Sequence, residues 1–348
     1  MFKIVSDSFN EMSSYLSHFR LLKDNFKELE DAAEFLKSSQ KLKGIGAGRS
    51  GGAIELGLIY LKKNADKLIS FYKDRGFENN GTLIAVSGSG KTSEVINEIK
   101  NGNFEKILVL TSKKENSPLL DAIKEKEVEY RLLHLSGREQ IEEKMLSYSE
   151  QQLVKGESPT LGDLFEEKSL FSMYLISKIL KGEKTNGHKE VDKLLTNFKN
   201  LKDKYQEFEQ IISNYHDSGI YFISFGRGEP ACYMLANRAN HYGFKVFKSG
   251  DSVAPRMKNK YAAILMDDDS EDYTQLIEEI KNKKTKFAEP PVIGFGPKNN
   301  TWSNKCDIYL EVDELFYAPI FINFALRRLA NKKGLTTTYT SDNHTDIQ

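Results

Sequence analysis

The chain has 348 residues, and its 50 Lys and Arg balance 50 Asp and Glu to a formal net charge of zero. At roughly 150 residues per domain this length predicts about two domains, and the balanced charge excludes nucleic-acid or membrane binding driven by an overall positive field. The two separated cysteines exclude a disulfide scaffold or a zinc module, and the lack of a secretion signal or of an apolar span of roughly 18 residues predicts a cytoplasmic protein.

The first 40 residues predict a helical segment. Apolar residues recur there at the spacing of one helix face, at Met12, Tyr15, Leu16, Phe19, Leu22, Phe26 and Leu29.

Strand candidates follow at residues 41–46, 81–86 and 106–111. Each is followed by a polar or glycine-rich turn and then by a stretch with helical apolar spacing. Strands that alternate with helices predict right-handed crossovers and a parallel sheet with helices on both faces.

The second half repeats this pattern. Gly48-Arg49 aligns with Gly226-Arg227 at an offset of 178, and the same offset sets LIAVSGSGKTSE opposite YAAILMDDDSED. We therefore expect a tandem duplication with a diverged second copy. The predicted boundaries are a helical segment at 1–40, a first domain at 41–182, a linker helix at 183–213, a second domain at 214–334 and a polar tail with His344 at 335–348.

GAGRSG at Gly46–Gly51 matches the GxGxxG pattern, in which glycines let the backbone approach a phosphate at a helix N-terminus. Taken alone, the pattern also fits a tight strand-to-helix turn without a ligand. A nicotinamide enzyme would need an acidic residue after the next strand, and Asp74 is placed too ambiguously to supply it.

SGSGKTSE at Ser87–Glu94 resembles a Walker A loop through GK[ST]. The motif needs a glycine where the chain has Ala85, and Thr111 stands where a magnesium-binding Asp is expected, so a nucleotide hydrolase is disfavoured. The loop does supply hydroxyls and backbone N–H groups at a predicted helix N-terminus, which favours a phosphate site. The alternative, a simple helix N-cap, accounts for one hydroxyl of the three.

Together the two turns resemble the sugar isomerase (SIS) domain family, whose phosphate loop reads S-x-S-G-x-T-x-E. GAGRSG, PTLGDLFE at 159–166 and GDSVAPRM at 250–257 are similar to the 6-phospho-3-hexuloisomerases, whereas two domains in one chain are similar to the isomerase half of glucosamine-6-phosphate synthase. The resemblance implies two tandem SIS domains, each a three-layer α/β/α, flavodoxin-like parallel sheet. The matching loop residues are Ser87, Ser89, Gly90, Thr92 and Glu94.

The resemblance implies a phosphosugar-binding aldose–ketose isomerase that moves a proton through an enediol on a hexose or amino-hexose phosphate, with no metal or cofactor. Glu166 is the candidate base, with a solvated first-turn glutamate as the alternative. Arg49 is expected to stabilise phosphate or enediolate oxygens, and Lys91 to add positive charge or remain solvated. The expected phosphate-binding residues are Ser50, Ser87, Gly88, Ser89, Gly90 and Thr92.

The second copy departs from the family. Asn237 and Ala254 stand nearest the positions of its catalytic Glu and His, so His241 and Arg256 are the candidate substitutes. The loop at 267–272 holds five carboxylates that would repel a phosphate, so one site per chain is expected; a metal there is conceivable, but a charged first helix turn is favoured. Tyr317 stands opposite Glu166, so the second copy also lacks that base.

Two other functions remain open. One is a phosphosugar-binding sensor or regulator without catalysis, and the other is a phosphosugar deglycase or deaminase on the same fold. Because family members pair through helices, a homodimer is expected.

Overall fold

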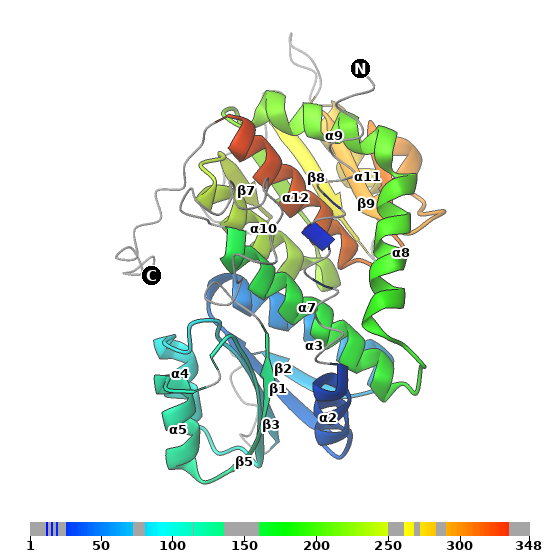
Figure 1. Ribbon diagram of the computed structural model, residues 1–348. Coiled ribbons are helices and arrows are strands. Elements are labelled where there is room, and N and C mark those ends of the chain that lie inside the picture. Colours follow the sequence, from blue (N-terminus) through cyan, green and yellow to red (C-terminus); the bar gives the residue numbers. More distant parts are fainter. Residues whose placement is uncertain are drawn as a thin grey trace. The chain divides into compact units, whose positions relative to one another are not determined.

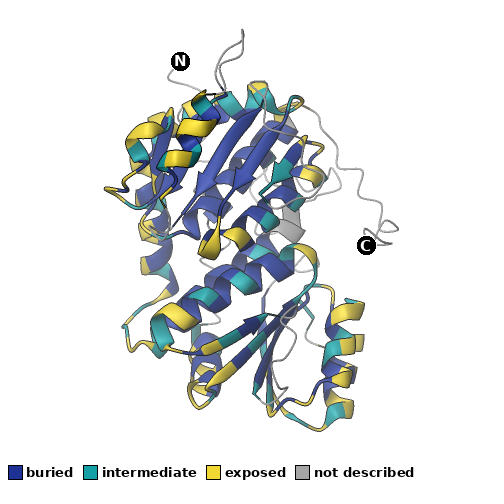
Figure 2. Cartoon of the chain, turned by 180° about the vertical axis from the view of Figure 1, so that it is seen from behind, coloured by how far each residue is buried: buried dark blue, intermediate teal, exposed yellow. Residues whose placement is uncertain are grey.

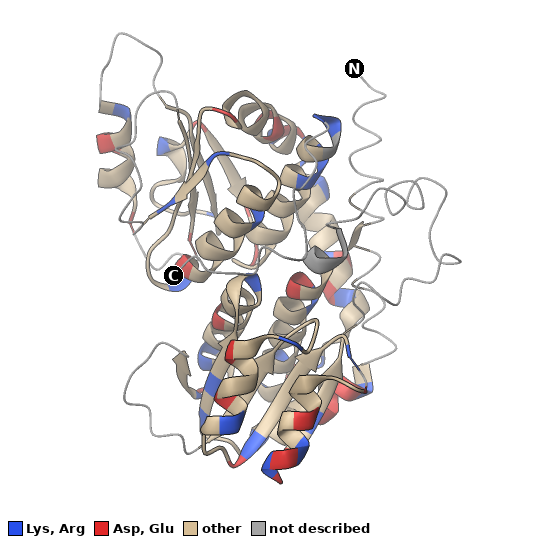
Figure 3. Cartoon of the chain, turned by 90° about the vertical axis from the view of Figure 1, so that its left-hand side faces the viewer, with Lys and Arg blue, Asp and Glu red and all other residues tan. Residues whose placement is uncertain are grey.

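The chain divides into two compact units, an N-terminal unit of Ser13–Lys193 and a C-terminal unit of Leu194–Gln348 together with Met1–Met12. No helix in the part of the chain that the structure describes is long and apolar enough to span a membrane. Figure 3 shows basic and acidic residues interspersed over both units. The computed structural model describes residues 12, 15, 16, 19, 26–71, 81–113, 115–135, 160–249, 261–267, 272–282 and 290–333.

The N-terminal unit contains a five-stranded sheet of order β2-β1-β3-β4-β5 in which every neighbouring pair is parallel. β3 is buried along its whole length, because a parallel sheet is covered on both faces. The strands are β1 (Lys41–Gly46), β2 (Leu68–Phe71), β3 (Thr82–Val86), β4 (Lys106–Thr111) and β5 (Glu129–His134).

Helices cover both faces of this sheet (Figure 1), which confirms the predicted three layers. α4 (Ser93–Asn101) and α5 (Pro118–Lys126) pack on one face through an apolar cluster with β1, β3 and β4. The other layer is formed by α2 (Phe26–Lys37), α3 (Gly48–Ala65) and α7 (Thr160–Leu180).

The predicted N-terminal helix is confirmed at its described positions. Met12, Tyr15, Leu16 and Phe19 are helical and buried. The ring of Phe19 meets that of Phe171 on α7 edge to face, with ring centroids 5.6 Å apart. The apolar face of this segment is therefore part of the core.

The C-terminal unit has a second parallel sheet of order β7-β6-β8-β9-β10, the same flavodoxin-like order as the first. Its three central strands, β6, β8 and β9, are buried along their whole length (Figure 2). The strands are β6 (Ile220–Ile223), β7 (Val246–Lys248), β8 (Ala262–Met266), β9 (Val292–Gly296) and β10 (Ile308–Glu311). The helices of this unit are α9 (Lys202–Tyr215), η3 (Gly226–Gly228), α10 (Glu229–His241), α11 (Thr274–Asn282), η4 (Ser303–Lys305) and α12 (Tyr317–Lys332).

The single linker helix expected between the sheets is two helices, α8 (Gly187–Asn200) and α9. The break falls at Leu201, whose N–H bonds to the carbonyls of Asn197 and Phe198 and whose own carbonyl starts α9 by accepting from Tyr205 N at 2.8 Å. The buried Leu201 side chain fixes this corner, and Asn197 Nδ2 donates to the carbonyl of Glu311.

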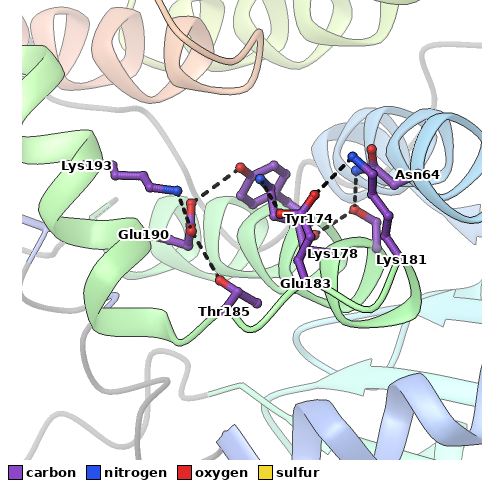
Figure 4. Close-up of polar contacts among 9 residues, drawn as sticks. Asn64, Tyr174, Lys178, Lys181, Glu183, Thr185, Glu190 and Lys193 are labelled. Carbon is purple, nitrogen blue, oxygen red and sulfur yellow. Dashed lines mark hydrogen bonds and ion pairs between the residues drawn. The ribbon is translucent and has the colours of Figure 1, made fainter.

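A buried carboxylate ties the start of α8 to the end of α7 (Figure 4). Glu190 is 2% exposed and accepts from Lys193 Nζ at 2.8 Å, Thr185 Oγ1 at 3.2 Å and Tyr174 Oη at 3.4 Å. These three donors offset the cost of burying the charge. The joint between the two helices therefore has a defined geometry within the N-terminal unit.

Replacing Gly57 with Ala is expected to destabilise the N-terminal unit by about 1 to 3 kcal/mol. α3 crosses α7 there so closely that a Cβ atom would lie 2.7 Å from Cβ of Met173, and a Cβ cannot move without the backbone. The gain in helix propensity, about 1 kcal/mol, is smaller. Urea unfolding measures the change. The control is Gly187→Ala in α8, where a Cβ meets nothing within 4 Å; equal effects of the two changes would refute the close contact.

Candidate functional site

The two turns singled out in the sequence meet at one edge of the first sheet. Gly46 at the end of β1 pairs with Val86 at the end of β3, so the turns that follow are neighbours. In a sheet of order 2-1-3-4-5 the connections diverge between the first and third strands, and the crevice at their carboxyl ends is the usual ligand site. The topology therefore places GAGRSG and SGSGKTSE side by side at this crevice.

The first turn is shaped by its glycines. A Cβ on Gly46 would lie 2.7 Å from the Ser50 carbonyl, and one on Gly51 would lie 2.8 Å from the Gly46 carbonyl. Gly48 has a φ of +53°. β1 and α3 can therefore approach this closely only with glycine at these positions. The N-cap residue of α3 is Ala47, which makes no side-chain cap, so the first N–H groups of α3 lack a capping side chain.

Two of the three hydroxyls of the second turn lie within hydrogen-bond distance of each other. Ser87 is buried, and its Oγ lies 2.8 Å from Thr92 Oγ1 and accepts from Gly90 N at 3.2 Å. Thr92 is the N-cap residue of α4 but makes no side-chain cap bond. The simple N-cap alternative therefore does not describe this turn. Ser89 is exposed, and its Oγ accepts from Lys91 N at 3.2 Å.

Two helix N-termini thus lie beside each other without capping side chains. Ser50 lies in the first turn of α3, and Ser87, Ser89 and Thr92 precede the first turn of α4. Exposed N–H groups and the positive ends of helix dipoles attract anions, and hydroxyls supply neutral donors. This arrangement can hold a phosphate group.

Arg49 and Glu166 lie together next to these turns. Arg49 Nη1 is 3.6 Å from Glu166 Oε2, and the side chains are only 15% and 12% exposed. Glu166 lies on α7, directly after Phe165, whose ring would be 3.0 Å from a Cβ on Gly88. The structure therefore brings the predicted base and guanidinium together beside the phosphate loop, and Glu166 is not the solvated glutamate of the alternative.

No protein-family model matches the chain, and no curated protein matches it. Among solved structures, glucosamine-6-phosphate deaminase from Thermotoga maritima is 14% identical, with a TM-score of 0.64 over 99% of this chain and 98% of that one. Tagatose-6-phosphate ketose/aldose isomerase from Escherichia coli is 13% identical, with a TM-score of 0.59 over 99% and 96%. The C-terminal domain of glucosamine-fructose-6-phosphate aminotransferase from Francisella tularensis is 15% identical, with a TM-score of 0.58 over 96% and 97%.

The chain has the fold of these solved structures, two parallel five-stranded sheets flanked by helices, which confirms the fold that the resemblance implied. The likeness covers nearly the whole length of each of these chains, so it includes both sheets.

Several predicted residues lie elsewhere in the structure. Lys91 is exposed on the phosphate loop, and His241 is the last residue of α10 in the C-terminal unit. Tyr317 is buried and is the first residue of α12, whereas Glu166 lies six residues after the first residue of α7. Arg256 lies outside the described residues. No group of three or more His, Cys, Asp or Glu residues that could hold a metal occurs within the described ranges.

The predicted constant offset of 178 between the two halves is wrong for the strands β3 and β8. Gly48 and Gly226 have φ values of +53° and +56°, so the first turns do correspond at an offset of 178. The residues directly after β3 and β8, Ser87 and Asp267, both donate their N–H to the neighbouring strand at 3.0 Å and are 180 residues apart. LIAV thus aligns with AILM, because the C-terminal unit has two more residues between turn and strand. Asp267 is fully buried, and residues 268–271 of the acidic loop lie outside the described part.

In the C-terminal unit, side chains bond or pack against the equivalent first turn. Phe225 N donates to Tyr273 Oη at 3.0 Å, and the two rings stack with centroids 5.9 Å apart. Ser224 Oγ donates to the Met266 carbonyl at 2.6 Å and occupies the space next to Gly228. Burial raises the pKa of Tyr273 to about 12, so its hydroxyl stays neutral. The first turn of the C-terminal unit is therefore bonded to side chains of its own unit.

Ser112 is a residue of this site that sequence reasoning missed. Its N–H and Oγ both donate to the Gly88 carbonyl of the phosphate loop. The available signal is its position directly after β4, because residues that follow adjacent parallel strands meet at the same edge.

Lys168 on α7 predicts a pH dependence of stability. The side chain is buried, and burial lowers its pKa from the ordinary 10.5 to about 8. Between these values the unfolded chain binds more protons than the folded chain, so the free energy of unfolding rises with pH through this window. Urea unfolding of wild type and Lys168→Met at pH 8 and pH 10 should show a difference that shifts in favour of wild type at the higher pH. An equal difference at both pH values would contradict the lowered pKa.

Proposed function

We propose that this chain is an aldose–ketose isomerase acting on a hexose or amino-hexose phosphate. The observation that carries the proposal is the Arg49–Glu166 pair, 3.6 Å apart, beside two uncapped helix N-termini at the crevice of a SIS fold. Phosphorylated sugars appear in the names of the structural neighbours, among them a ketose/aldose isomerase. One of these neighbours is a glucosamine-6-phosphate deaminase, so the test below also measures the release of ammonia.

The phosphate would be held by neutral donors. Ser89 and Thr92, with the N–H groups at the start of α4, would face its oxygens, and Ser50 would add a hydroxyl from α3. Lys91, exposed on the loop, would contribute charge without a fixed contact.

Glu166 would act as the base. Its carboxylate would take the proton from C2 of the open-chain aldose, and the electrons of that C–H bond would form the C1–C2 double bond of an enediolate while the carbonyl oxygen becomes negative. Arg49 would stabilise this oxygen. Return of the proton to C1, with a proton transfer from the C2 hydroxyl, then gives the ketose.

Incubation in deuterated water tests the reaction. The purified protein would be mixed separately with fructose 6-phosphate, glucosamine 6-phosphate and a hexulose 6-phosphate, and the products followed by NMR. Deuterium at C1 or C2 supports the isomerase. Release of ammonia would instead identify a deaminase, and binding without exchange or release would leave only a phosphosugar sensor.

The double variant Ser89→Ala, Thr92→Ala is expected to weaken binding of fructose 6-phosphate by about 100-fold or more, because each hydroxyl loses a hydrogen bond to a charged group. Titration calorimetry measures the change. Ser93→Ala is the matched control, since Ser93 starts α4 but its hydroxyl bonds to Glu94 at 3.1 Å. Unchanged binding by the double variant would mean that the phosphate lies elsewhere.

The proposal includes three further expectations: a homodimer in solution, a cytoplasmic location and an origin by duplication. The duplication is supported by the two sheets of equal strand order and by two nine-residue helices of similar sequence, SEVINEIKN in α4 and TQLIEEIKN in α11.

A further inference from the structure

Two carbonyl groups of the loop between β3 and α4 accept hydrogen bonds from residues that follow the neighbouring strand β4. The Gly88 carbonyl accepts from both the N–H and the Oγ of Ser112, and the Gly90 carbonyl accepts from Leu119 N at 3.0 Å. Ser112 directly follows β4, and Leu119 lies in the first turn of α5. The loop is therefore fastened to the next strand-to-helix connection of the sheet.

These bonds set the direction of the loop N–H groups. In a planar trans peptide the C=O and the following N–H point in opposite directions. Because the Gly88 carbonyl points at Ser112, the N–H of Ser89 points away from it, out of the loop. Within the described part of the chain this N–H has no acceptor. The Ser89 N–H therefore has a fixed direction and is available to donate to a ligand.

His134 holds Ser112 in turn. At the end of β5, His134 Nε2 lies 3.2 Å from the Ser112 carbonyl. A carbonyl only accepts, so Nε2 carries the hydrogen. The ring is buried, and the backbone N–H of His134 is 3.4 Å from Glu28 Oε2 on α2. A chain of hydrogen bonds thus runs from His134 through Ser112 to Gly88.

We propose that Ser112 and His134 are positioning residues that orient the Ser89 N–H toward the phosphate and so set the affinity for phosphorylated sugars. The inference rests on the proposed function, since it names residues that act on the same site without touching the ligand. Loss of the Ser112 hydroxyl would leave the Ser112 N–H as the one remaining Ser112 donor to the Gly88 carbonyl. Loss of the His134 ring would remove the hydrogen bond to the Ser112 carbonyl and so loosen the position of Ser112.

The experiment compares Ser112→Ala and His134→Leu with the donor-retaining variants Ser112→Thr and His134→Gln. Calorimetry with fructose 6-phosphate and with inorganic phosphate gives the affinities, and amide hydrogen exchange of the peptide spanning residues 87–92 gives the order of the loop. We expect Ser112→Ala and His134→Leu to weaken both ligands about 5- to 20-fold and to raise loop exchange, and the two donor-retaining variants to recover most of both.

Ser39→Ala is the matched control, because its hydroxyl bonds to Thr82 at the opposite end of β3. Unchanged loop exchange in Ser112→Ala, or no recovery by the donor-retaining variants, would overturn the positioning role. If wild type binds neither ligand, the proposed function fails, while the exchange comparison still decides whether Ser112 and His134 orient the loop.

Discussion

Replacing Glu166 with Gln is expected to slow solvent deuterium exchange into the sugar phosphate by about 10²- to 10⁴-fold, the usual contribution of a general base. The amide has nearly the same shape but cannot accept the substrate proton. Because Glu166 does not belong to the phosphate loop, the dissociation constant for the sugar phosphate should change far less than the exchange rate. NMR exchange and calorimetry on the same preparation measure the two effects.

Glu98→Gln is the matched control for this change. Glu98 on α4 is 15% exposed and pairs with Lys43 at 2.7 Å, so it resembles Glu166 in burial and in having a cationic partner. It should keep full exchange activity. Equal activity of the Glu166 and Glu98 variants would remove Glu166 from the mechanism and leave the phosphate site without its base.

Replacing Arg328 with Met is expected to lower the free energy of unfolding of the C-terminal unit by about 3 to 5 kcal/mol. Arg328 on α12 donates from Nη1 to both carboxylate oxygens of Glu209 on α9, at 2.7 Å each, and both side chains are buried. Without the guanidinium the carboxylate loses its charged partner in a site shielded from water. Urea unfolding gives the change.

The double variant Glu209→Leu, Arg328→Met should regain most of this loss, because no buried charge is then left uncompensated. Lys305→Met breaks an exposed pair with Glu278 and should cost less than about 1 kcal/mol. A small effect of Arg328→Met, similar to that of Lys305→Met, would show that the buried pair contributes no more than a surface pair.

The parallel sheets could be predicted because their signals are local. Strands such as β3 and β4 are continuous apolar runs, each followed by a turn and a stretch of helical spacing, and these patterns are set within a few residues. The turn between β3 and α4 could be predicted for the same reason, since its hydroxyls and glycines are contiguous, while its binding of a phosphate stays a prediction.

The contacts between distant segments could not be predicted from spacing. Arg49 and Glu166 come from α3 and α7, far apart in the chain, and only the family resemblance indicated Glu166. The break at Leu201 depends on packing and on a side-chain bond to β10, which helical periodicity does not show. The place of Ser112 at this site depends on where β4, the strand next to β3, ends.

The side-chain bonds at the first turn of the C-terminal unit have a consequence for engineering. Exchanging its acidic loop for SGSGKT would remove the negative charge but would leave the Phe225 N–H bonded to Tyr273 and the Ser224 hydroxyl bonded to Met266. Under the proposed function, one site per chain would thus follow from packing as well as from electrostatics. A designer seeking two ligands per chain would have to replace Tyr273 and Ser224 before the charge of the loop could matter.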